Sequence, residues 1–313
     1  MRPVVYLVRA LPGGVPAALA AALDLRGGAP RPPPRDRLVE EARDAEILAV
    51  TYLDRVDEPL LAALPRLRQV SSYGVGVNHL DLEACRRRGV TVTNTPDVVT
   101  GATADLAMAL LLAAARRVCE GDRLVRAGGW REALPEFLLG REVFGRTLGI
   151  VGFGRIGRAV ARRALGFDMQ VIWSGPRPVD FPGVRRVELD ELLATSDFVS
   201  LHCPLTDATR DLLSRERIAR LKPGAVVVNT SRGAVVDEEA LADALEEGRV
   251  FAAGLDVFRD EPQVPERLRR LENVVLTPHV GSGTVETRTA MARMVWEELA
   301  RAADGRPPAH RVV

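Results

Sequence analysis

Short runs of β-branched residues alternate with helical stretches along the 313-residue chain. Such alternation is typical of parallel α/β sheets, because each strand returns to the same edge of the sheet through a helix. The pattern falls into two series of strands, and the first covers Val4–Val8, Ile47–Val50, Gln69–Ser72 and Val90–Thr93. The second series covers Thr147–Val151, Gln170–Trp173, Phe198–Leu201, Ala225–Asn229, Phe251–Leu255 and Val274–Leu276. The sequence therefore predicts an α/β protein built from two doubly wound parallel sheets.

The length of the chain also favours two domains over a single core. A further helix, Val285–Arg301, follows the second series of strands, and we expect it to return to the first domain. We therefore predict a discontinuous domain of residues 1–97 and 282–313, and a second domain of residues 98–281. One long helix, Thr103–Ala127, is expected between the two series of strands.

Basic and acidic residues nearly balance, 43 against 42, so the chain lacks the basic excess of nucleic-acid-binding surfaces. The three cysteines are far apart, which fits neither a disulfide framework nor a metal site with closely spaced ligands. The N-terminus lacks the pattern of a signal peptide. The longest apolar candidate for a membrane span, Leu106–Ala115, is shorter than the ~20 residues required. We expect a cytoplasmic protein with no metal site, no membrane anchor and no nucleic-acid partner.

A glycine-rich loop lies between a predicted strand and a predicted helix, and it consists of Gly152, Phe153, Gly154, Arg155, Ile156 and Gly157. In a dinucleotide-binding loop, the first glycine permits a tight turn and the second lets the backbone approach the pyrophosphate. The third glycine lets helix and strand pack closely, and the helix N-terminus faces the phosphates. With a strand before the loop and a helix after it, the motif predicts a dinucleotide site rather than a packing turn.

The choice of nicotinamide cofactor is expected to depend on the end of the next strand, about 20 residues further on. An NAD site normally places Asp or Glu there, whereas this strand ends in Ser174 and Gly175, and no acid follows until Asp180. Ser174 can donate a hydrogen bond to a 2′-phosphate, and Arg177 can pair with it. The sequence predicts a preference for NADP(H) over NAD(H). The alternative is that Arg177 is solvated and the protein uses both cofactors.

Three polar residues follow strands in the second half of the second series: Arg232 in NTSRG, Glu261 in RDEP and His279 in TPHVGSG. Ligand crevices in such sheets lie beyond the carboxyl ends of the strands, so we expect the three side chains to share one cleft. They suit the reduction of a 2-keto acid, with Arg232 as substrate anchor, His279 as general acid/base and Glu261 as the partner of His279. Taken singly, each could instead be a cap or a surface charge.

The motifs GFGRIG, NTSRG, GLDVF…DEP and TPHVGS, in this order, resemble those of the D-isomer-specific 2-hydroxyacid dehydrogenases. The resemblance covers nearly the whole chain. The segments NTPDVVT, GLDVF and HVGSGTVETR are most similar to glyoxylate/hydroxypyruvate reductases, including plant hydroxyphenylpyruvate reductases. The resemblance implies a Rossmann cofactor domain and a discontinuous flavodoxin-like substrate-binding domain. It also implies that the catalytic arginine, glutamate and histidine of the family correspond to Arg232, Glu261 and His279.

Further site residues follow from the resemblance alone. The backbone N–H groups of Val75 and Gly76, in the loop SYGVGV, match those that hold the substrate carboxylate. Family members are typically dimers built on the cofactor domain, and Trp130–Leu139 matches an arm that can reach the neighbour's active site. Leu134 and Phe137 are therefore candidate pocket residues. The positions that match cofactor contacts are Thr103, Phe153, Gly154, Arg155, Ile156, Pro204, Thr230, Asp256 and Gly281.

Other functions remain open at this point. The substrate could be a larger keto acid such as hydroxyphenylpyruvate, or the hydroxyacid could be D-lactate. A related fold serves as a dinucleotide-sensing transcriptional corepressor, which predicts a peptide-binding surface and very slow turnover, but the sequence indicates no peptide groove. The best prediction is an NADPH-preferring reductase of glyoxylate or hydroxypyruvate that can also use NAD(H).

Overall fold

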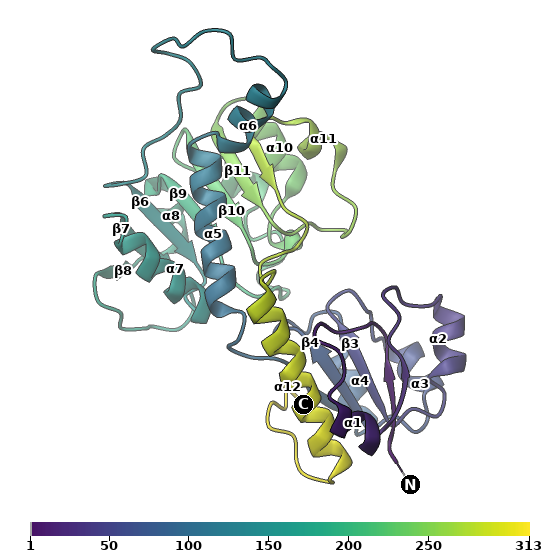
Figure 1. Cartoon of the computed structure of the whole chain (residues 1–313). Helices are drawn as coiled ribbons and strands as arrows, with labels where there is room; N and C mark the ends of the chain where they lie inside the picture. Colours follow the sequence, from purple (N-terminus) through teal and green to yellow (C-terminus); the bar gives the residue numbers. More distant parts are fainter. Residues whose placement is uncertain (1) are drawn as a thin grey trace. The chain divides into compact units, whose positions relative to one another are not determined.

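The computed structural model describes residues 2–313, which divide into two compact units. Unit 1 contains the chain up to Val99 together with Ser282–Val313, and unit 2 is Thr100–Gly281. Each unit is built around its own sheet, and the neighbouring strands of both sheets are parallel. The predicted fold class, with two doubly wound parallel sheets, is confirmed (Figure 1).

The sheet of unit 1 has five strands in the order β2-β1-β3-β4-β5, which is the order of flavodoxin-like sheets. The strands are β1 (Val4–Leu7), β2 (Asp24–Gly27), β3 (Ile47–Thr51), β4 (Gln69–Tyr73) and β5 (Thr91–Thr93). The prediction missed β2. Its sequence DLRG has a single apolar side chain, because the strand lies at the edge of the sheet and pairs only with β1.

Helices cover both faces of this sheet: α1 (Ala17–Ala22) and α12 (Val285–Ala303) lie on one, and α2 (Arg35–Glu41), α3 (Glu58–Ala63) and α4 (Leu82–Arg87) on the other. Trp296 and Leu299 of α12 are buried in one cluster with Val5 of β1 and Ile47 of β3. The C-terminal helix therefore completes the core that begins with the N-terminal strand, and Figure 1 shows it beside α1.

The sheet of unit 2 has seven strands in the order β12-β11-β10-β9-β6-β7-β8. They are β6 (Thr147–Val151), β7 (Gln170–Ser174), β8 (Val184–Arg186), β9 (Phe198–Leu201), β10 (Ala225–Asn229), β11 (Val250–Leu255) and β12 (Val274–Leu276). Six of these strands were predicted. The prediction missed β8, because two of its three residues are exposed arginines at the edge of the sheet. The strand order reverses between β6 and β9, and ligands of open α/β sheets bind beyond the carboxyl ends of the strands at such a point.

Helices also cover both faces of the sheet in unit 2. One face carries α5 (Thr100–Ala115) and α7 (Arg155–Leu165), and α6 (Val118–Arg126) follows α5. The other face carries α8 (Leu189–Thr195), α9 (Arg215–Ile218), α10 (Glu238–Glu246) and α11 (Glu266–Arg270), and a short 3-10 helix, η1 (Gly233–Val235), precedes α10. None of the helices in residues 2–313 combines the length and the apolar character that spanning a membrane requires.

The prediction of one helix over Thr103–Ala127 is wrong, because α5 ends at Ala115 and α6 begins at Val118. Arg117 lies between them with a φ of 53°, in the left-handed region, which interrupts the helix. The carbonyl of Ala115 accepts a hydrogen bond of 2.7 Å from the N–H of Arg141. The loop that follows α6 thus returns to the end of α5, so tertiary contacts rather than the apolar pattern determine where this helix stops.

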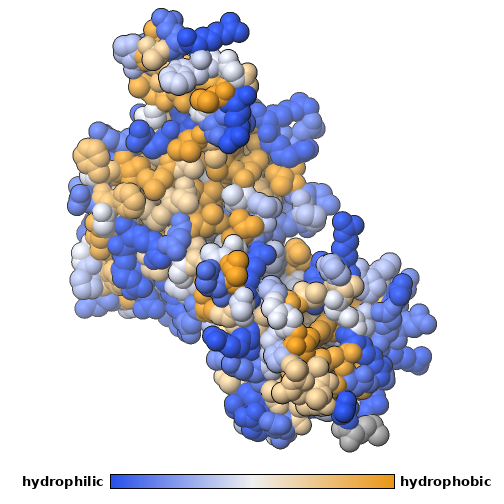
Figure 2. All heavy atoms as spheres, viewed as in Figure 1, coloured by the Kyte–Doolittle hydropathy of each residue, from blue (hydrophilic) through white to orange (hydrophobic). Residues whose placement is uncertain are grey.

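Large apolar side chains are exposed on unit 2 between the start of α6 and β6. The seven side chains in this stretch are each at least 42% exposed, and they are Val118, Val125, Trp130, Leu134, Phe137, Leu139 and Phe144. Figure 2 shows apolar residues gathered on the face of this unit that carries α5. A large exposed apolar surface of this kind is typical of a protein–protein interface.

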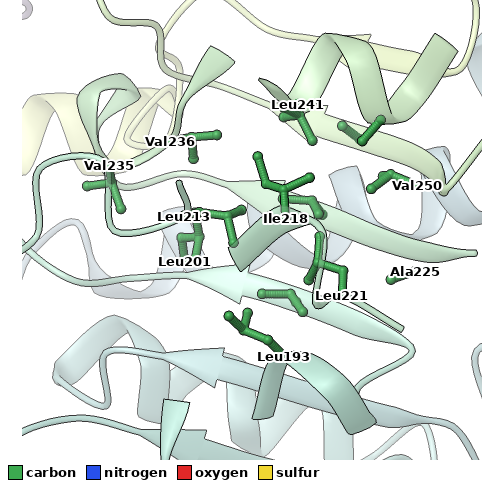
Figure 3. Packing of buried hydrophobic residues seen from close by; sticks show 14 of the residues in the cluster. Leu193, Leu201, Leu213, Ile218, Leu221, Ala225, Val235, Val236, Leu241 and Val250 are labelled. Atoms are coloured by element: carbon green, nitrogen blue, oxygen red, sulfur yellow. The ribbon is translucent and has the colours of Figure 1, made fainter. Parts of the chain in front are cut away.

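The face of the unit 2 sheet that carries α8 to α11 has a continuous apolar core (Figure 3). Leu193 of α8, Ile218 of α9 and Leu241 of α10 are all buried there. They pack with strand residues that include Leu201 of β9 and Val250 of β11. This packing fixes the positions of β9, β10 and β11, and with them the loops at the carboxyl ends of these strands.

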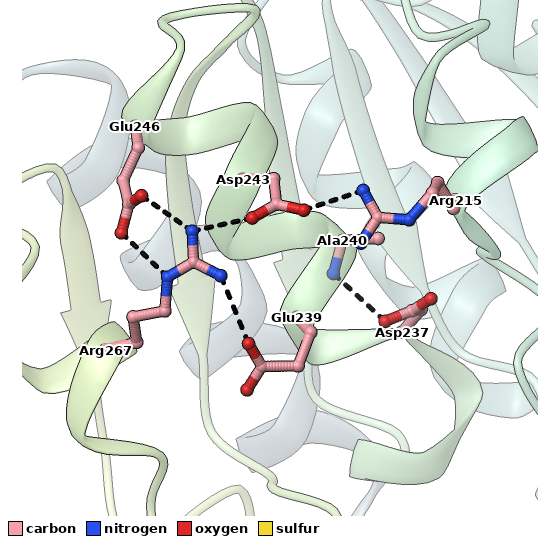
Figure 4. Close-up of polar contacts among 7 residues, drawn as sticks. All are labelled: Arg215, Asp237, Glu239, Ala240, Asp243, Glu246 and Arg267. Atoms are coloured by element: carbon pink, nitrogen blue, oxygen red, sulfur yellow. Dashed lines mark hydrogen bonds and ion pairs between the residues drawn. The ribbon is translucent and has the colours of Figure 1, made fainter.

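Charged side chains tie α10 to its neighbours α9 and α11 (Figure 4). Arg267 of α11 pairs with three carboxylates of α10 at 2.6–3.1 Å, and these belong to Glu239, Asp243 and Glu246. Arg215 of α9 pairs with Asp243 at 2.6 Å. Exposed pairs add little to stability singly. Together they orient α11, which follows the turn after β11, and that turn carries one of the candidate catalytic residues.

Candidate active site

Three neighbouring strands of unit 2, β10, β11 and β12, carry the residues predicted for catalysis. Arg232 follows β10, Glu261 follows β11 and His279 follows β12. All three side chains are partly buried. Parallel pairing thus places the three loops at the same edge of the sheet.

The turn after β10 is held by the side chain of Asn229, the last residue of the strand. Its carbonyl oxygen accepts hydrogen bonds from the N–H of Ser231 at 3.0 Å and from the hydroxyl of Ser231 at 2.8 Å. Its amide group donates to the carbonyl of Arg232 at 2.9 Å. Asn229 is 1% exposed, so its polar atoms need these partners. This role of Asn229 was not predicted from the sequence, although asparagine is a common turn residue.

At Gly233, the turn that carries Arg232 packs against the turn that leads to Glu261. A Cβ at Gly233 would lie 1.9 Å from the carbonyl carbon of Phe258 and 2.2 Å from the nitrogen of Arg259. The N–H of Phe258 in turn donates to Glu261 Oε1 at 3.0 Å. The absence of a side chain at Gly233 therefore allows the loops of two candidate catalytic residues to approach each other.

His279 and Glu261 form a hydrogen-bonded pair, with 2.7 Å between His279 Nδ1 and Glu261 Oε2. Burial acts to raise the pKa of the Glu261 carboxyl. The hydrogen bond and charge of His279, the N–H of Phe258 and the charge of Arg232 outweigh burial and hold that pKa below its usual value. Glu261 is therefore ionised at neutral pH and accepts a hydrogen bond from the Nδ1–H of His279, which leaves Nε2 for other partners.

Asp256, the residue after β11, holds the backbone around His279. His279 has a φ of 51°, in the left-handed region that non-glycine residues rarely adopt. The carboxylate of Asp256 accepts hydrogen bonds from the hydroxyl of Thr277 at 2.6 Å and from the N–H groups of Val280 and Gly281 at 2.8 Å each. Burial raises the pKa of the Asp256 carboxyl, and these hydrogen bonds oppose that shift. The side chain that was matched to a cofactor contact thus clamps the loop that presents His279.

The glycine loop after β6 leads into α7, with Gly154 at the helix N-cap. Gly152 has a φ of 92°, and a Cβ there would lie 2.5 Å from the nitrogen of Cys203. A Cβ on Gly157 would lie 2.3 Å from the carbonyl oxygen of Gly152, so helix and strand are closely packed. At Gly154, by contrast, no atom of residues 2–313 other than the glycine and its chain neighbours lies within 4 Å of the position that a Cβ would take, and none of their side chains caps the start of α7. The space beside the positive end of the α7 dipole fits the diphosphate of a nicotinamide dinucleotide.

Phe153 anchors this loop through its ring. The ring is buried and stacks on Trp173 of β7, with 4.5 Å between centroids and 14° between planes. Its edge meets Phe181 at 5.5 Å between centroids. Only the backbone of Phe153 is therefore available to a cofactor. Arg155 and Ile156 open α7, and Arg155 is exposed.

The remaining positions that match cofactor contacts lie in unit 2 near the same edge of the sheet. Thr103 and Asp256 flank Gly281, because a Cβ on Gly281 would lie 3.4 Å from Thr103 Cγ2 and 3.3 Å from Asp256 Oδ2. Thr230 follows β10 and is buried, and Pro204 is exposed in the loop after β9. The structure thus brings Thr103, Asp256 and Gly281 together beside the loop of the candidate histidine.

His202, the residue after β9, is a partly buried histidine of the same region. Its Nε2 lies 2.8 Å from Ser200 Oγ, and its Nδ1 lies 3.5 Å from Thr230 Oγ. Burial lowers the pKa of His202 to about 4, so the ring is neutral at pH 7. We therefore assign it a packing and hydrogen-bonding role.

The end of β7 carries the residues predicted to select the cofactor. Ser174 is partly buried, and its carbonyl accepts a hydrogen bond of 2.8 Å from the N–H of Gly152, so it lies beside the glycine loop. Arg177 is exposed in the loop after β7. The structure adds Arg186 of β8, whose Nη2 donates to the carbonyl of Gly175 at 2.9 Å. Arg186 was not predicted from the sequence, because its place beside Gly175 depends on the pairing of β8 with β7.

Val75 and Gly76, the matched donors to a substrate carboxylate, lie in unit 1 in the loop after β4. Among residues 2–313, no protein acceptor is found for their N–H groups. The side-chain amide of Asn94 donates to the carbonyl of Val75 at 2.8 Å, and the N–H of Thr95 donates to the carbonyl of Gly74 at 3.0 Å. These bonds orient the peptide groups of the loop, and two successive N–H groups of this kind suit an anion. The role of Asn94 was not predicted from the sequence.

The segment Trp130–Leu139 lies in the loop between α6 and β6. Trp130 is 59% exposed, and the candidate pocket residues Leu134 and Phe137 are 54% and 42% exposed. These side chains therefore belong to the exposed apolar surface of unit 2 and not to its core.

The chain is similar in sequence and in fold to known proteins. Residues 108–281 match the sequence profile of the D-isomer specific 2-hydroxyacid dehydrogenase, NAD binding domain. The whole chain aligns with a glyoxylate reductase of Thermococcus litoralis at 44% identity and covers 97% of that protein. A solved structure from Thermus thermophilus is similar, with a TM-score of 0.93 and 45% identity over 99% of this chain and 100% of that one. So is the NADPH-dependent glyoxylate/hydroxypyruvate reductase of Sinorhizobium meliloti, solved with NADP and malonate, with a TM-score of 0.86 and 32% identity over 100% of this chain and 97% of that one.

Proposed function

Because the chain belongs to the family of D-isomer-specific 2-hydroxyacid dehydrogenases, we propose that it reduces a small 2-keto acid, such as glyoxylate or hydroxypyruvate, with NADPH preferred over NADH. The observation that carries this proposal is the pair of His279 and Glu261, 2.7 Å apart, with Arg232 close enough to lower the pKa of Glu261. An acid/base pair and a cation for a carboxylate are the groups that the reduction of a keto acid requires.

The glycine loop and the start of α7 support the binding of a nicotinamide dinucleotide, as the open space at Gly154 suggests. When bound, the reduced nicotinamide supplies the hydride that the keto carbon receives. Ser174 and Arg177 support the preference for NADPH, since residues 171–179 contain no acid that would repel a 2′-phosphate. The related reductase of Sinorhizobium meliloti is also described as NADPH-dependent. NADH is the alternative cofactor.

We propose that His279 donates a proton from Nε2 to the keto oxygen of the substrate. Glu261 keeps Nδ1 protonated, and its negative charge stabilises the imidazolium before the proton is given up. After donation, the neutral imidazole still donates its Nδ1–H to Glu261. In the reverse direction, the same Nε2 takes the proton of the hydroxyl group.

Arg232 anchors the substrate carboxylate in this proposal and polarises the keto group. The N–H groups of Val75 and Gly76 act as further donors to the carboxylate. This assignment is supported by the orientation of the loop, because the side-chain amide of Asn94 donates a hydrogen bond to the carbonyl of Val75.

A panel of 2-keto acids, each assayed with NADPH and with NADH and ranked by kcat/KM, tests the proposal directly. We expect glyoxylate or hydroxypyruvate with NADPH to rank first. A first rank for hydroxyphenylpyruvate would assign the larger substrate, and a clear preference for NADH would overturn the cofactor assignment. Turnover far below ~1 s⁻¹ on every keto acid would indicate a dinucleotide sensor instead of a reductase.

Variants of the candidate catalytic residues test the mechanism. His279→Ala should lower kcat by ~10²–10⁴-fold while leaving NADPH binding nearly unchanged. Arg232→Ala should raise KM as well as lower kcat. His310→Ala is the control, because His310 lies in the C-terminal segment of unit 1. Retention of wild-type kcat/KM in both His279→Ala and Arg232→Ala would show that the mechanism is wrong.

We also propose that the protein forms a homodimer through unit 2. The exposed apolar side chains between Val118 and Phe144 support this interface. The arm Trp130–Leu139 would then bring Leu134 and Phe137 to the neighbour's substrate pocket. The cytoplasmic location stays a prediction of the sequence analysis.

A further inference from the structure

Two adjacent arginines on β8, Arg185 and Arg186, have different surroundings. Successive side chains of a strand point to opposite faces of the sheet. Arg185 pairs with Glu191 at 2.9 Å, so its charge is balanced locally. Arg186 instead donates from Nη2 to the carbonyl of Gly175 at 2.9 Å. Among residues 2–313, no carboxylate lies within ion-pair distance of Arg186.

The position of Arg186 is fixed by strand pairing and by a cation–π contact with Trp173. β8 pairs with β7 in parallel, with Arg186 opposite Trp173. The guanidinium carbon lies 5.7 Å from the centroid of the Trp173 ring, within the range of a cation–π contact. Trp173 is buried and stacks on Phe153 of the glycine loop. The guanidinium is therefore held at the carboxyl end of β7, beside the loop that fits the dinucleotide.

The end of β7 is the place where dinucleotide-binding sheets distinguish the 2′-hydroxyl of NAD from the 2′-phosphate of NADP. Residues 171–179 contain no acid. Arg177 is exposed there, and among residues 2–313 it has no ion pair or hydrogen bond. The Arg186 guanidinium thus lies at the carbonyl of Gly175, and Arg177 follows two residues later in the chain. Among residues 2–313, neither arginine has an ion pair with a carboxylate.

We propose that Arg186 is a specificity-determining residue that binds the 2′-phosphate of NADPH together with Ser174 and Arg177. This inference rests on the proposed function, and it adds a residue from a strand that lies outside the glycine loop and its following strand. A guanidinium group forms charge-assisted hydrogen bonds to phosphate oxygens, which are stronger than neutral ones. Both arginines are exposed, but Arg186 already contacts the carbonyl of Gly175 and the ring of Trp173, so it loses less side-chain freedom on binding than Arg177.

The experiment measures binding by isothermal titration calorimetry with two probes, adenosine 2′,5′-bisphosphate and adenosine 5′-monophosphate. Neither probe requires turnover. We expect the wild type to bind the 2′-phosphorylated probe more tightly. Arg186→Ala should weaken that binding by ~10-fold or more while changing the affinity for adenosine 5′-monophosphate by less than ~2-fold. Arg185→Ala, the matched control on the same strand, should bind both probes like the wild type.

A second variant separates phosphate binding from a structural role. Arg186→Gln keeps a donor for the carbonyl of Gly175 but removes the charge. We therefore expect its affinity for the 2′-phosphorylated probe to fall as much as that of Arg186→Ala. Restored binding in Arg186→Gln, or equal loss of both probes in either variant, would assign Arg186 a structural role and overturn the proposal. A wild type that binds both probes equally would also overturn it. The proposed reduction of a keto acid fails separately, in the substrate panel, so the two failures are distinguishable.

Discussion

Two buried polar side chains hold the candidate catalytic residues in place. Asn229 fixes the turn that carries Arg232, and Asp256 fixes the loop that carries His279. Both side chains are 1% exposed. A buried polar group that loses its partner costs about 1–3 kcal/mol. Substitutions at these two positions should therefore affect stability and activity together.

Asp256→Asn is a sharp test of the clamp on the His279 loop, because the side chain keeps its shape. Both carboxylate oxygens accept hydrogen bonds, so the amide nitrogen of Asn would face a donor wherever it lies. We expect a loss of about 1–3 kcal/mol in the free energy of unfolding, measured by urea denaturation, and a lower kcat. Thr277→Val removes only one of the three donors and should cost less. Equal stability of the wild type and Asp256→Asn would contradict the clamp.

The lowered pKa of Glu261 predicts a pH dependence of stability. A carboxyl whose pKa is lower in the folded protein contributes stability above its usual pKa of 4.5 and loses that contribution as the pH falls through the lowered value. The free energy of unfolding of the wild type should therefore fall more steeply below about pH 4.5 than that of Glu261→Gln. The control is Glu247→Gln, an exposed residue after α10. Parallel curves for the wild type and Glu261→Gln would show that the pair with His279 contributes no such stability.

At the scale of elements, the site is built where turns after neighbouring strands pack against each other. η1 follows β10, and its first residue, Gly233, touches the backbone of the turn after β11. The contact has no room for even one extra carbon atom. The turns after β10 and β11 are therefore in direct backbone contact at Gly233.

Gly233→Ala should separate the two turns. The added Cβ would lie 1.9 Å from the carbonyl carbon of Phe258, so the backbone must shift. We expect a loss of about 1–3 kcal/mol in the free energy of unfolding, as for other overpacked positions, with a lower kcat/KM. Gly101→Ala is the matched control, because a Cβ at Gly101 in α5 would lie within 4 Å of no described atom beyond its chain neighbours and the backbone of its own helix. A Gly233→Ala variant with wild-type stability and kcat/KM would rule out the close approach.

The elements predicted from the sequence are those whose apolar residues reflect their burial in the fold. Strands such as β10, with five buried residues in AVVVN, are runs of β-branched side chains. The edge strands β2 and β8 were missed, because a strand with one neighbour and exposed side chains needs no such run. The break between α5 and α6 was missed for a different reason. It depends on a hydrogen bond from Arg141, which lies far beyond the helix in sequence.

The same distinction applies to the site. Arg232, Glu261 and His279 were predicted because each follows a strand and has suitable chemistry. The supporting residues Asn94 and Arg186 were missed, since their roles depend on which backbone carbonyl lies opposite them in the folded chain. Such pairings are determined by tertiary packing, and a single sequence carries no periodic signal for them.

At the scale of the whole molecule, each unit has apolar clusters on both faces of its own sheet. The chain passes between the units twice, after Val99 and after Gly281. Large apolar side chains that remain exposed are concentrated in one stretch of unit 2. A homodimer would bury this stretch without any change in either core.

Sedimentation velocity tests this assembly. We expect the wild type to sediment as a dimer, and we expect the double variant Trp130→Glu, Phe144→Glu to sediment as a monomer, because charges in a buried apolar interface are costly. Val285→Glu is the control, since Val285 is 80% exposed but lies in unit 1. A monomeric wild type at micromolar concentration would contradict the proposed interface.

The strand order of unit 2 places the proposed cofactor-selecting residue Arg186 and the candidate catalytic residue His279 at opposite edges of the sheet. β8, with Arg186, lies at one edge of the sheet, and β12, which precedes His279, lies at the other. An edge strand has only one neighbour, so replacements there disturb few other residues. If Arg186, Ser174 and Arg177 select the electron donor as proposed, the choice of cofactor could be changed, by drift or by engineering, through residues of β8, the end of β7 and the loop after β7. The acid/base chemistry proposed at the β12 edge would stay the same when the cofactor changes.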